Sequence, residues 1–271
     1  MSTQPKYTAM SWVLALLTIL LPQATVAQLK LYDNFSSSRI NPSKWIGEPA
    51  SLVGGSDQDR REVSIGLFGE GENRRLGISQ TSYSAITDNS GSSGIGFGLG
   101  FVQPSQVKAV SFTLAVDEMQ VVDCGSNSSF GTVGFFGDYF NPTGATNGQT
   151  GDIVASIGVT RFSQTGALDV GASVSQCQDA RCNGQTTIGS QDLGLVKAGS
   201  TNTLSTIWDQ PNHQFIFRLN NDPTIALPYM MPNSFPPGKA DKSFFVLATF
   251  PTAPRSPDPS LRSMHVSATF M

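Results

Sequence analysis

Three carboxylates and two arginines stand together in one six-residue stretch, Asp57-Gln58-Asp59-Arg60-Arg61-Glu62. Two carboxyl groups held about 5 Å apart are the arrangement with which a retaining glycosidase cleaves a glycosidic bond. On a strand, Asp57 and Asp59 share a face, whereas Glu62 falls on the opposite face unless a bulge shifts the register. The alternative is a polar turn followed by a solvated strand start. A motif this short favours the polar turn, so we assign no catalytic residue.

A second set of side chains is suited to holding a sugar. Aromatic rings stack on the apolar faces of sugar rings, while the sugar hydroxyls need polar partners. Strand alternation leaves several such side chains outside the expected core, although core burial is the alternative for the tryptophan. The candidate ligand-binding residues are Trp208, Asp209, Tyr139, Asn141 and Arg161.

Other site chemistries find little support in the sequence. The chain has two histidines, His213 and His265, and neither has zinc-ligand spacing to a cysteine. A G-x-S-x-G motif is absent from the sequence. We therefore predict no metal or cofactor, with structural calcium on Asp33, Asp152 or Asp209 as the alternative, because carboxylate oxygens are hard ligands.

The three cysteines allow a disulfide if the chain is exported. Cys177 and Cys182 bracket four residues and can close a short loop. Cys124 is an alternative partner for either one. One cysteine is left over in each pairing.

The N-terminus has the pattern of a signal peptide. Lys6 precedes an apolar run from Met10 to Leu21, which is short for a membrane span, and Thr25-Val26-Ala27 offers small residues for cleavage. We expect a signal peptide over residues 1–27, a single domain over 28–271, and a secreted or periplasmic location. Removing Lys6 leaves 16 of the 17 basic residues against 20 acidic ones, with no basic stripe. The sequence therefore predicts no nucleic-acid partner and no membrane association after cleavage.

The sequence segments that contain the candidate site residues are predicted to be strands. Outside the leader we find no adequate run with the 3.6-residue apolar period, and strand signals recur about every ten to fifteen residues with turn chemistry between them. Val110, Phe112, Leu114 and Val116, for example, share one face of a long strand. This spacing predicts an all-β fold, an antiparallel sandwich of two sheets.

The clearest hairpin signal lies between Thr203 and Tyr229. Leu204 to Trp208 and Phe215 to Leu219 read as strands joined by the polar turn Asp209 to His213. Alternation places Phe215, Phe217 and Leu219 on one face, which we expect to be core.

The order of these elements resembles the concanavalin A-like lectin/glucanase jelly roll, more narrowly its secreted bacterial members. The resemblance rests on Asp33-Asn34-Phe35 leading to Lys44-Trp45, on the strand Arg61 to Ile65, and on the late hairpin after Ile207. Members that cleave β-glucans carry E-x-D-x-x-E, with the nucleophile first and the acid/base last. The resemblance implies that Asp57 and Glu62 occupy those two positions, with the shorter Asp57 in place of the glutamate.

This fold commonly binds or cleaves glycans, but fold alone does not assign a function. We expect a non-catalytic protein that binds carbohydrate or associates with the cell surface or matrix, with a polysaccharide or glycan as its partner. One alternative is a glycoside hydrolase or polysaccharide lyase that acts in the sandwich groove. The other is a structural protein without a small ligand.

Overall fold

The computed structural model describes residues 29–47, 51–56, 59–84, 95–121, 130–144, 147–162, 167–249 and 263–270. Apart from strands, these residues form two short 3-10 helices, η1 (Gly71–Asn73) and η2 (Pro104–Gln106). Leu31–Met271 form one compact unit. In the described ranges, no helix combines the length and apolarity needed to span a membrane.

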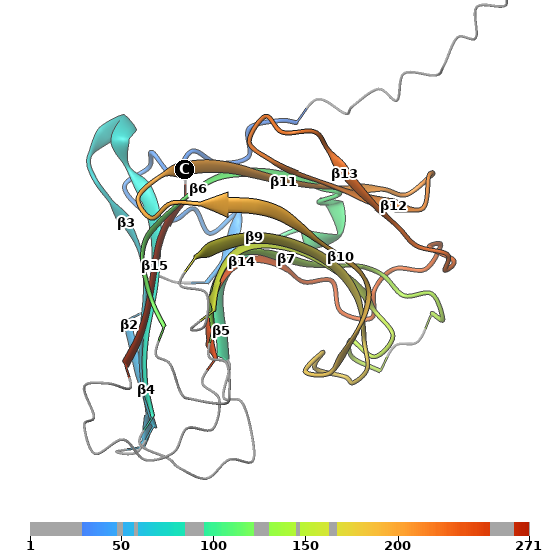
Figure 1. Cartoon of the computed structure of the whole chain (residues 1–271), viewed down its shortest axis with the longest axis horizontal. Helices are drawn as coiled ribbons and strands as arrows, with labels where there is room; N and C mark the ends of the chain where they lie inside the picture. The colour runs from blue at the N-terminus through green and yellow to red at the C-terminus, as the bar shows by residue number, and fades with distance from the viewer. Residues whose placement is uncertain are drawn as a thin grey trace, which may run out of the picture. The chain divides into compact units, whose positions relative to one another are not determined.

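The strands form two antiparallel sheets (Figure 1). In spatial order, the seven-stranded sheet contains β1 (Trp45–Ile46), β5 (Ile95–Phe101), β14 (Lys242–Thr249), β7 (Phe130–Phe140), β8 (Ile153–Phe162), β9 (Leu168–Cys177) and β10 (Gln185–Val196). The eight-stranded sheet contains β13 (Ile225–Pro228), β12 (Gln214–Leu219), β11 (Thr201–Asp209), β6 (Ala109–Gln120), β15 (Ser263–Phe270), β4 (Arg75–Ser84), β3 (Asp59–Phe68) and β2 (Ser51–Ser56). This arrangement confirms the predicted all-β, jelly-roll sandwich.

The core lies between the two sheets, where alternate residues of each strand meet. Phe112 of β6 and Phe244 of β14 bring their ring centroids to 5.0 Å across the interface, and Phe135 of β7 packs beside both. Val110, Phe112, Leu114 and Val116 are all buried, so the predicted face of β6 is confirmed. The sequence alternation therefore identified the inner side of this strand correctly.

The late hairpin forms as predicted. β11 pairs with β12 from Leu204 opposite Leu219 to Trp208 opposite Phe215. Phe215 and Phe217 are fully buried and Leu219 nearly so. His213, at the end of the turn, has a φ of 52°, a left-handed conformation that turns accommodate.

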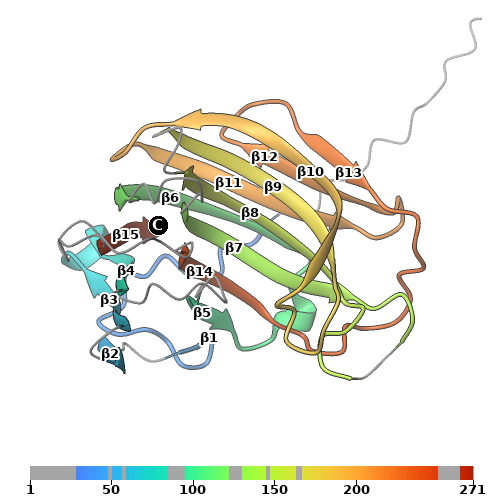
Figure 2. The same cartoon turned by 60° about the horizontal axis from the view of Figure 1, so that its bottom comes forward.

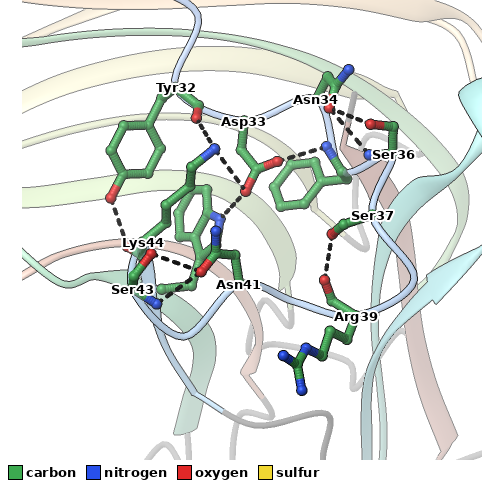
Figure 3. Close-up of polar contacts among 11 residues, drawn as sticks. Tyr32, Asp33, Asn34, Ser36, Ser37, Arg39, Asn41, Ser43 and Lys44 are labelled. Carbon is green, nitrogen blue, oxygen red and sulfur yellow. Dashed lines mark hydrogen bonds and ion pairs between the residues drawn. The ribbon is translucent and has the colours of Figure 1, made fainter.

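The early segment is fastened to the start of β1 by a polar cluster (Figure 3). The carboxylate of Asp33 accepts hydrogen bonds from the Trp45 indole nitrogen at 2.8 Å and from the Phe35 backbone at 2.9 Å. Lys44 donates to the Tyr32 carbonyl at 2.6 Å, and the Tyr32 hydroxyl donates to the Lys44 carbonyl at 2.7 Å. These bonds hold the Trp45 ring over Phe101 and Phe35, at the edge of the core.

Candidate functional site

The outer face of the seven-stranded sheet is hollowed into a groove over β14, β7, β8, β9 and β10, four of which run side by side in Figure 2. Its volume is about 580 Å³, within the range of small-molecule sites. On β8, Ile157 and Val159 face the core, so the intervening Gly158 and Thr160 face outward. The same alternation on β9 turns Asp169, Gly171 and Ser173 outward.

The strand register arranges the groove residues, together with their strand neighbours Gly134, Phe136 and Leu195, in three rows that cross the strands. The first row contains Phe136, Ser156, Ser173 and Ser190. The second row contains Phe245, Gly134, Gly158, Gly171 and Asp192. The third row contains Thr132, Thr160, Asp169 and Leu195. Two hydroxyl-bearing rows therefore flank a central row that is mostly glycine.

The hydroxyls of the outer rows are held in pairs. Ser156 Oγ and Ser173 Oγ lie 2.9 Å apart, and one of their two protons fills that bond. The other O–H stays available to a ligand in the described structure. Thr132 Oγ1 donates to the Val159 carbonyl at 3.1 Å, so the 2.8 Å contact with Thr160 Oγ1 takes its proton from Thr160. The serine pair thus offers a donor, and the threonine pair offers acceptors.

Aromatic and acidic side chains complete the groove. Phe245 stands at the β14 side, and Phe162 at the end of β8 is 38% exposed. Asp169 and Asp192 come from neighbouring strands, and Asp192 Oδ1 accepts a hydrogen bond from the Gly194 backbone at 2.8 Å. Among the described lining residues these two carboxylates are the charged groups. The groove therefore carries negative charge without a basic neighbour in its lining.

A disulfide loop covers the sheet beside the groove. Cys177 and Cys182 are bonded, as predicted for the nearer pair, and pack with Val154 and Phe136 in a small apolar cluster. Phe136 is opposite Ser156 in the sheet, so this cluster adjoins the serine row. Cys124, the alternative partner, lies outside the described residues.

Two predicted ligand-binding residues, Tyr139 and Asn141, are interior. Tyr139 is 4% exposed and packs edge-on against Phe215, so its expected place outside the core is wrong. Asn141 is fully buried and donates to Asp152 Oδ1 at 2.8 Å. Tyr139 shares the inward face of β7 with Val133 and Phe135, so the alternation itself places it in the core. On the other face of β7, Gln149 covers Asp138.

The other three predicted residues lie elsewhere on the sandwich. Trp208 is half-buried, stacks on the Phe140 ring, and donates to the Tyr229 hydroxyl at 2.8 Å. Asp209, the last residue of β11, accepts from two side-chain amides at 2.8 Å. Arg161 donates to the Met119 carbonyl of the opposite sheet at 2.6 Å. None of the five predicted residues is among those described as lining the groove, although Trp208 and Tyr139 are neighbours.

A buried polar cluster joins the end of β7 to the start of β14. Asp138 is fully buried, and both of its carboxylate oxygens accept from Gln149 Nε2 at 3.1 Å. Lys242, 2% exposed, donates to the Asp138 backbone carbonyl at 2.5 Å and lies 4.3 Å from the centroid of the Tyr139 ring. Burial raises the pKa of Asp138 to about 7 and lowers the pKa of Lys242 to about 8. Burial therefore moves the pKa values of both groups toward neutral pH.

The acidic stretch considered first is only partly described. Asp57 lies outside the described residues, and β3, which begins at Asp59 and contains Glu62, is described as backbone alone at these positions. β3 is one strand from the edge of the eight-stranded sheet, whereas the groove belongs to the other sheet. The carboxylate pair proposed from the resemblance stays a prediction.

The carboxylates considered for calcium have protein partners. Asp33 binds Trp45, and Asp152 accepts from the Gly238 backbone at 2.7 Å as well as from Asn141. No group of three or more His, Cys, Asp or Glu side chains arranged for a metal ion occurs in the described part of the chain.

The groove residues were not predicted as a site. Ser156, Thr160 and Ser173 resemble the solvated face of any strand, because small hydroxyl residues are common there. A usable signal was present in Gly134, Gly158 and Gly171, each near the middle of a strand, where glycine is unfavourable unless something approaches closely. Only the register shows that the three lie side by side.

No protein-family model matches the sequence. No curated protein matches it either. Solved structures similar in fold include a glycoside hydrolase family 16 endo-glucanase from Bacteroides ovatus, with 11% identity, a TM-score of 0.45, and coverage of 88% of this chain and 98% of that one. A laminarinase from Flavobacterium sp. UMI-01 has 9% identity, a TM-score of 0.41, and coverage of 88% and 97%. Peanut lectin has 13% identity, a TM-score of 0.33, and coverage of 81% and 93%. These three identities are below 25% and the three TM-scores are below 0.5, so the likeness assigns neither a family nor a function to this chain.

Proposed function

We propose that this is a non-catalytic carbohydrate-binding protein whose ligand lies in the groove on the seven-stranded sheet. The observation that carries the proposal is the combination of paired hydroxyls with two partly exposed phenylalanines on one hollowed face. Sugar rings have apolar C–H faces and a rim of hydroxyls, so they need both kinds of surface at once. The groove supplies donors, acceptors and aromatic faces within about 580 Å³.

The individual contacts follow from the chemistry of each group. Phe245 offers a ring face for stacking, which depends on shape and dispersion, and Phe162, whose ring also packs against Phe130, adds apolar surface at the end of β8. The free O–H of the Ser156–Ser173 pair donates to a sugar oxygen, and Asp192 accepts from sugar hydroxyls. Since the hydroxyl pairs are already fixed by their mutual bonds, binding orders few side chains and loses little conformational entropy.

The test is binding to an array of neutral polysaccharides, followed by calorimetry on those retained. We expect the protein to bind at least one of them, and Phe245→Ala to weaken that binding tenfold or more, which equals about 1.4 kcal/mol. Phe235→Ala is the matched control, because Phe235 is a 49% exposed phenylalanine outside the groove lining. No binding by the wild-type protein would overturn the proposal and favour a structural protein without a small ligand.

A second candidate function is glycoside hydrolysis or polysaccharide lysis in the same groove. The observation that favours it is the presence of Asp169 and Asp192 on adjacent strands of the groove, since glycosidases use two carboxyl groups. Reducing-sugar release by the wild-type protein would support it. Loss of that activity in Asp192→Asn would locate it in the groove, whereas loss in Glu62→Ala alone would locate it in the acidic stretch of β3.

We also propose that the protein is exported after removal of residues 1–27. The supporting pattern is the apolar run that ends before the small residues Thr25-Val26-Ala27. N-terminal sequencing of the protein from its native host should begin at Gln28. A mature chain that retains Met1 would contradict this proposal.

A further inference from the structure

The central row of the groove is a strip almost without side chains, which we call the glycine lane and define as Gly134, Gly158 and Gly171. The three glycines are direct partners in the register of β7, β8 and β9. Phe245 of β14 pairs with Gly134 at one end, and Asp192 of β10 pairs with Gly171 at the other. From β14 to β10 the row crosses four strand spacings, or about 19 Å.

The glycine lane has polar walls. Ser156 and Ser173 stand two residues from Gly158 and Gly171 along their strands on one side, and Thr160 stands two residues from Gly158 on the other. Two residues along a strand correspond to about 7 Å. A ligand in the lane therefore approaches the sheet backbone closely while its edges reach hydroxyls on both sides.

The fold requires two of these glycines but not the third. A Cβ added to Gly134 would collide with the Ile157 carbonyl, and one added to Gly158 would lie 2.7 Å from the Val133 carbonyl oxygen. A Cβ added to Gly171 would meet no heavy atom within 4 Å, and Gly171 needs no left-handed backbone angle. Glycine weakens a strand interior, and packing does not explain its presence at this exposed position. Close approach of a ligand does explain it.

The charge of the groove narrows the class of ligand. Asp169 and Asp192 are the charged side chains among the described lining residues. Like charges brought together at an interface weaken binding strongly, so a chain bearing carboxylate or sulfate groups is disfavoured.

We propose that the glycine lane holds a single uncharged glycan chain laid across the strands, and that Gly171 is the position that lets this chain approach the sheet closely. The inference rests on the proposed carbohydrate-binding function and adds the class of glycan and the residue that allows its close approach. Gly171→Ala places a methyl group in the lane, and Gly171→Val fills it. Valine favours strands, and alanine is less unfavourable in a strand than glycine, so we expect both variants to fold.

The experiment uses cellulose, xylan and mixed-linkage glucan oligosaccharides, each immobilised in unsubstituted and carboxymethylated forms. We expect the wild-type protein to bind at least one unsubstituted form at least tenfold more tightly than its carboxymethylated counterpart. Gly171→Ala should weaken that binding about threefold and Gly171→Val at least tenfold, with thermal midpoints no lower than that of the wild type. Gly189→Ala is the matched control on β10, since its added Cβ would make an ordinary 3.7 Å contact with Leu227.

The outcomes separate this inference from the function on which it rests. Wild-type binding that Gly171→Val leaves unchanged would overturn the role of Gly171 while the groove remains a glycan site through Phe245. Equal binding of unsubstituted and carboxymethylated forms would overturn the preference for uncharged chains. Binding to none of the oligosaccharides or polysaccharides would overturn the proposed function and the lane together.

Discussion

Replacing Asp138 by asparagine should change how the stability of the protein depends on pH. The Asp138 carboxyl is buried, and its pKa is raised from the ordinary value of 3.8 to about 7. The folded state therefore binds a proton that the unfolded chain has already released. As the pH rises from about 4 to 7, the wild-type protein loses the stability contributed by that proton.

The size of this loss follows from the shift. Each pKa unit corresponds to about 1.4 kcal/mol, so a shift of about three units corresponds to about 4 kcal/mol across this pH range. Asp138→Asn has no charge to bury and keeps an oxygen that can accept from Gln149. We expect the variant to be more stable than the wild type at pH 8 and to lose the advantage by pH 4.

Urea denaturation at pH 4, 6 and 8 measures the free energy of unfolding for both proteins. Other carboxyl groups titrate in the same range, so the informative quantity is the difference between wild type and variant at each pH. Asp222→Asn, at an exposed turn, is the control and should run parallel to the wild type. If Asp138→Asn also runs parallel to the wild type, the reasoning from burial is wrong.

Three further outcomes are expected. Lys242→Met should abolish a rise of about 3 kcal/mol in wild-type stability between pH 8 and 10.5, because the folded state, with a pKa of about 8, releases the lysine proton first. Trp45→Phe should lower the free energy of unfolding by about 2 kcal/mol, since the Asp33 carboxylate loses its indole donor. Replacing Cys177 and Cys182 by serine should lower it by about 2 kcal/mol, the loop-closure contribution expected for so short a loop. Urea midpoints measure all three.

Each of these predictions has a result that contradicts it. A Lys242→Met protein that still gains stability above pH 8 in parallel with the wild type would remove the lysine as the cause. A Trp45→Phe midpoint equal to that of the wild type would show that the ring alone anchors the early segment. Equal midpoints for the wild type with and without reducing agent would show that the disulfide adds nothing to stability.

The sequence predicted those parts of the fold in which alternation and burial agree. Phe215 and Phe217 alternate with polar or half-exposed neighbours, and each is buried as the period of two requires. Val110 and Phe112 behave in the same way on β6. The Cys177–Cys182 disulfide could also be predicted from the sequence, because only four residues separate the two cysteines.

The site was harder to predict because it depends on contacts between distant strands. Tyr139 was expected outside the core, but it shares the inward face of β7 with Phe135 and packs against Phe215 of the opposite sheet. The glycine lane depends on the register of three strands. Alternation excludes a shift of one residue, but a shift of two would keep Gly158 and Gly171 on the same face and separate them by about 7 Å, and the sequence does not distinguish these two registers.

β10 forms one margin of the seven-stranded sheet, and its register against β9 shifts twice, between Thr187 and Gly189 and between Asp192 and Gly194. A sheet margin presents backbone donors and acceptors to which another chain can hydrogen-bond. Here the two bulges bend the strand. The second bulge contains the charged side chain of Asp192 and, two residues later, Gly194, which has a φ of 116°. A regular strand from another molecule cannot keep one hydrogen-bond register along the full length of this edge. The same irregularities that place Asp192 at the end of the groove therefore discourage aggregation through open-ended sheet extension.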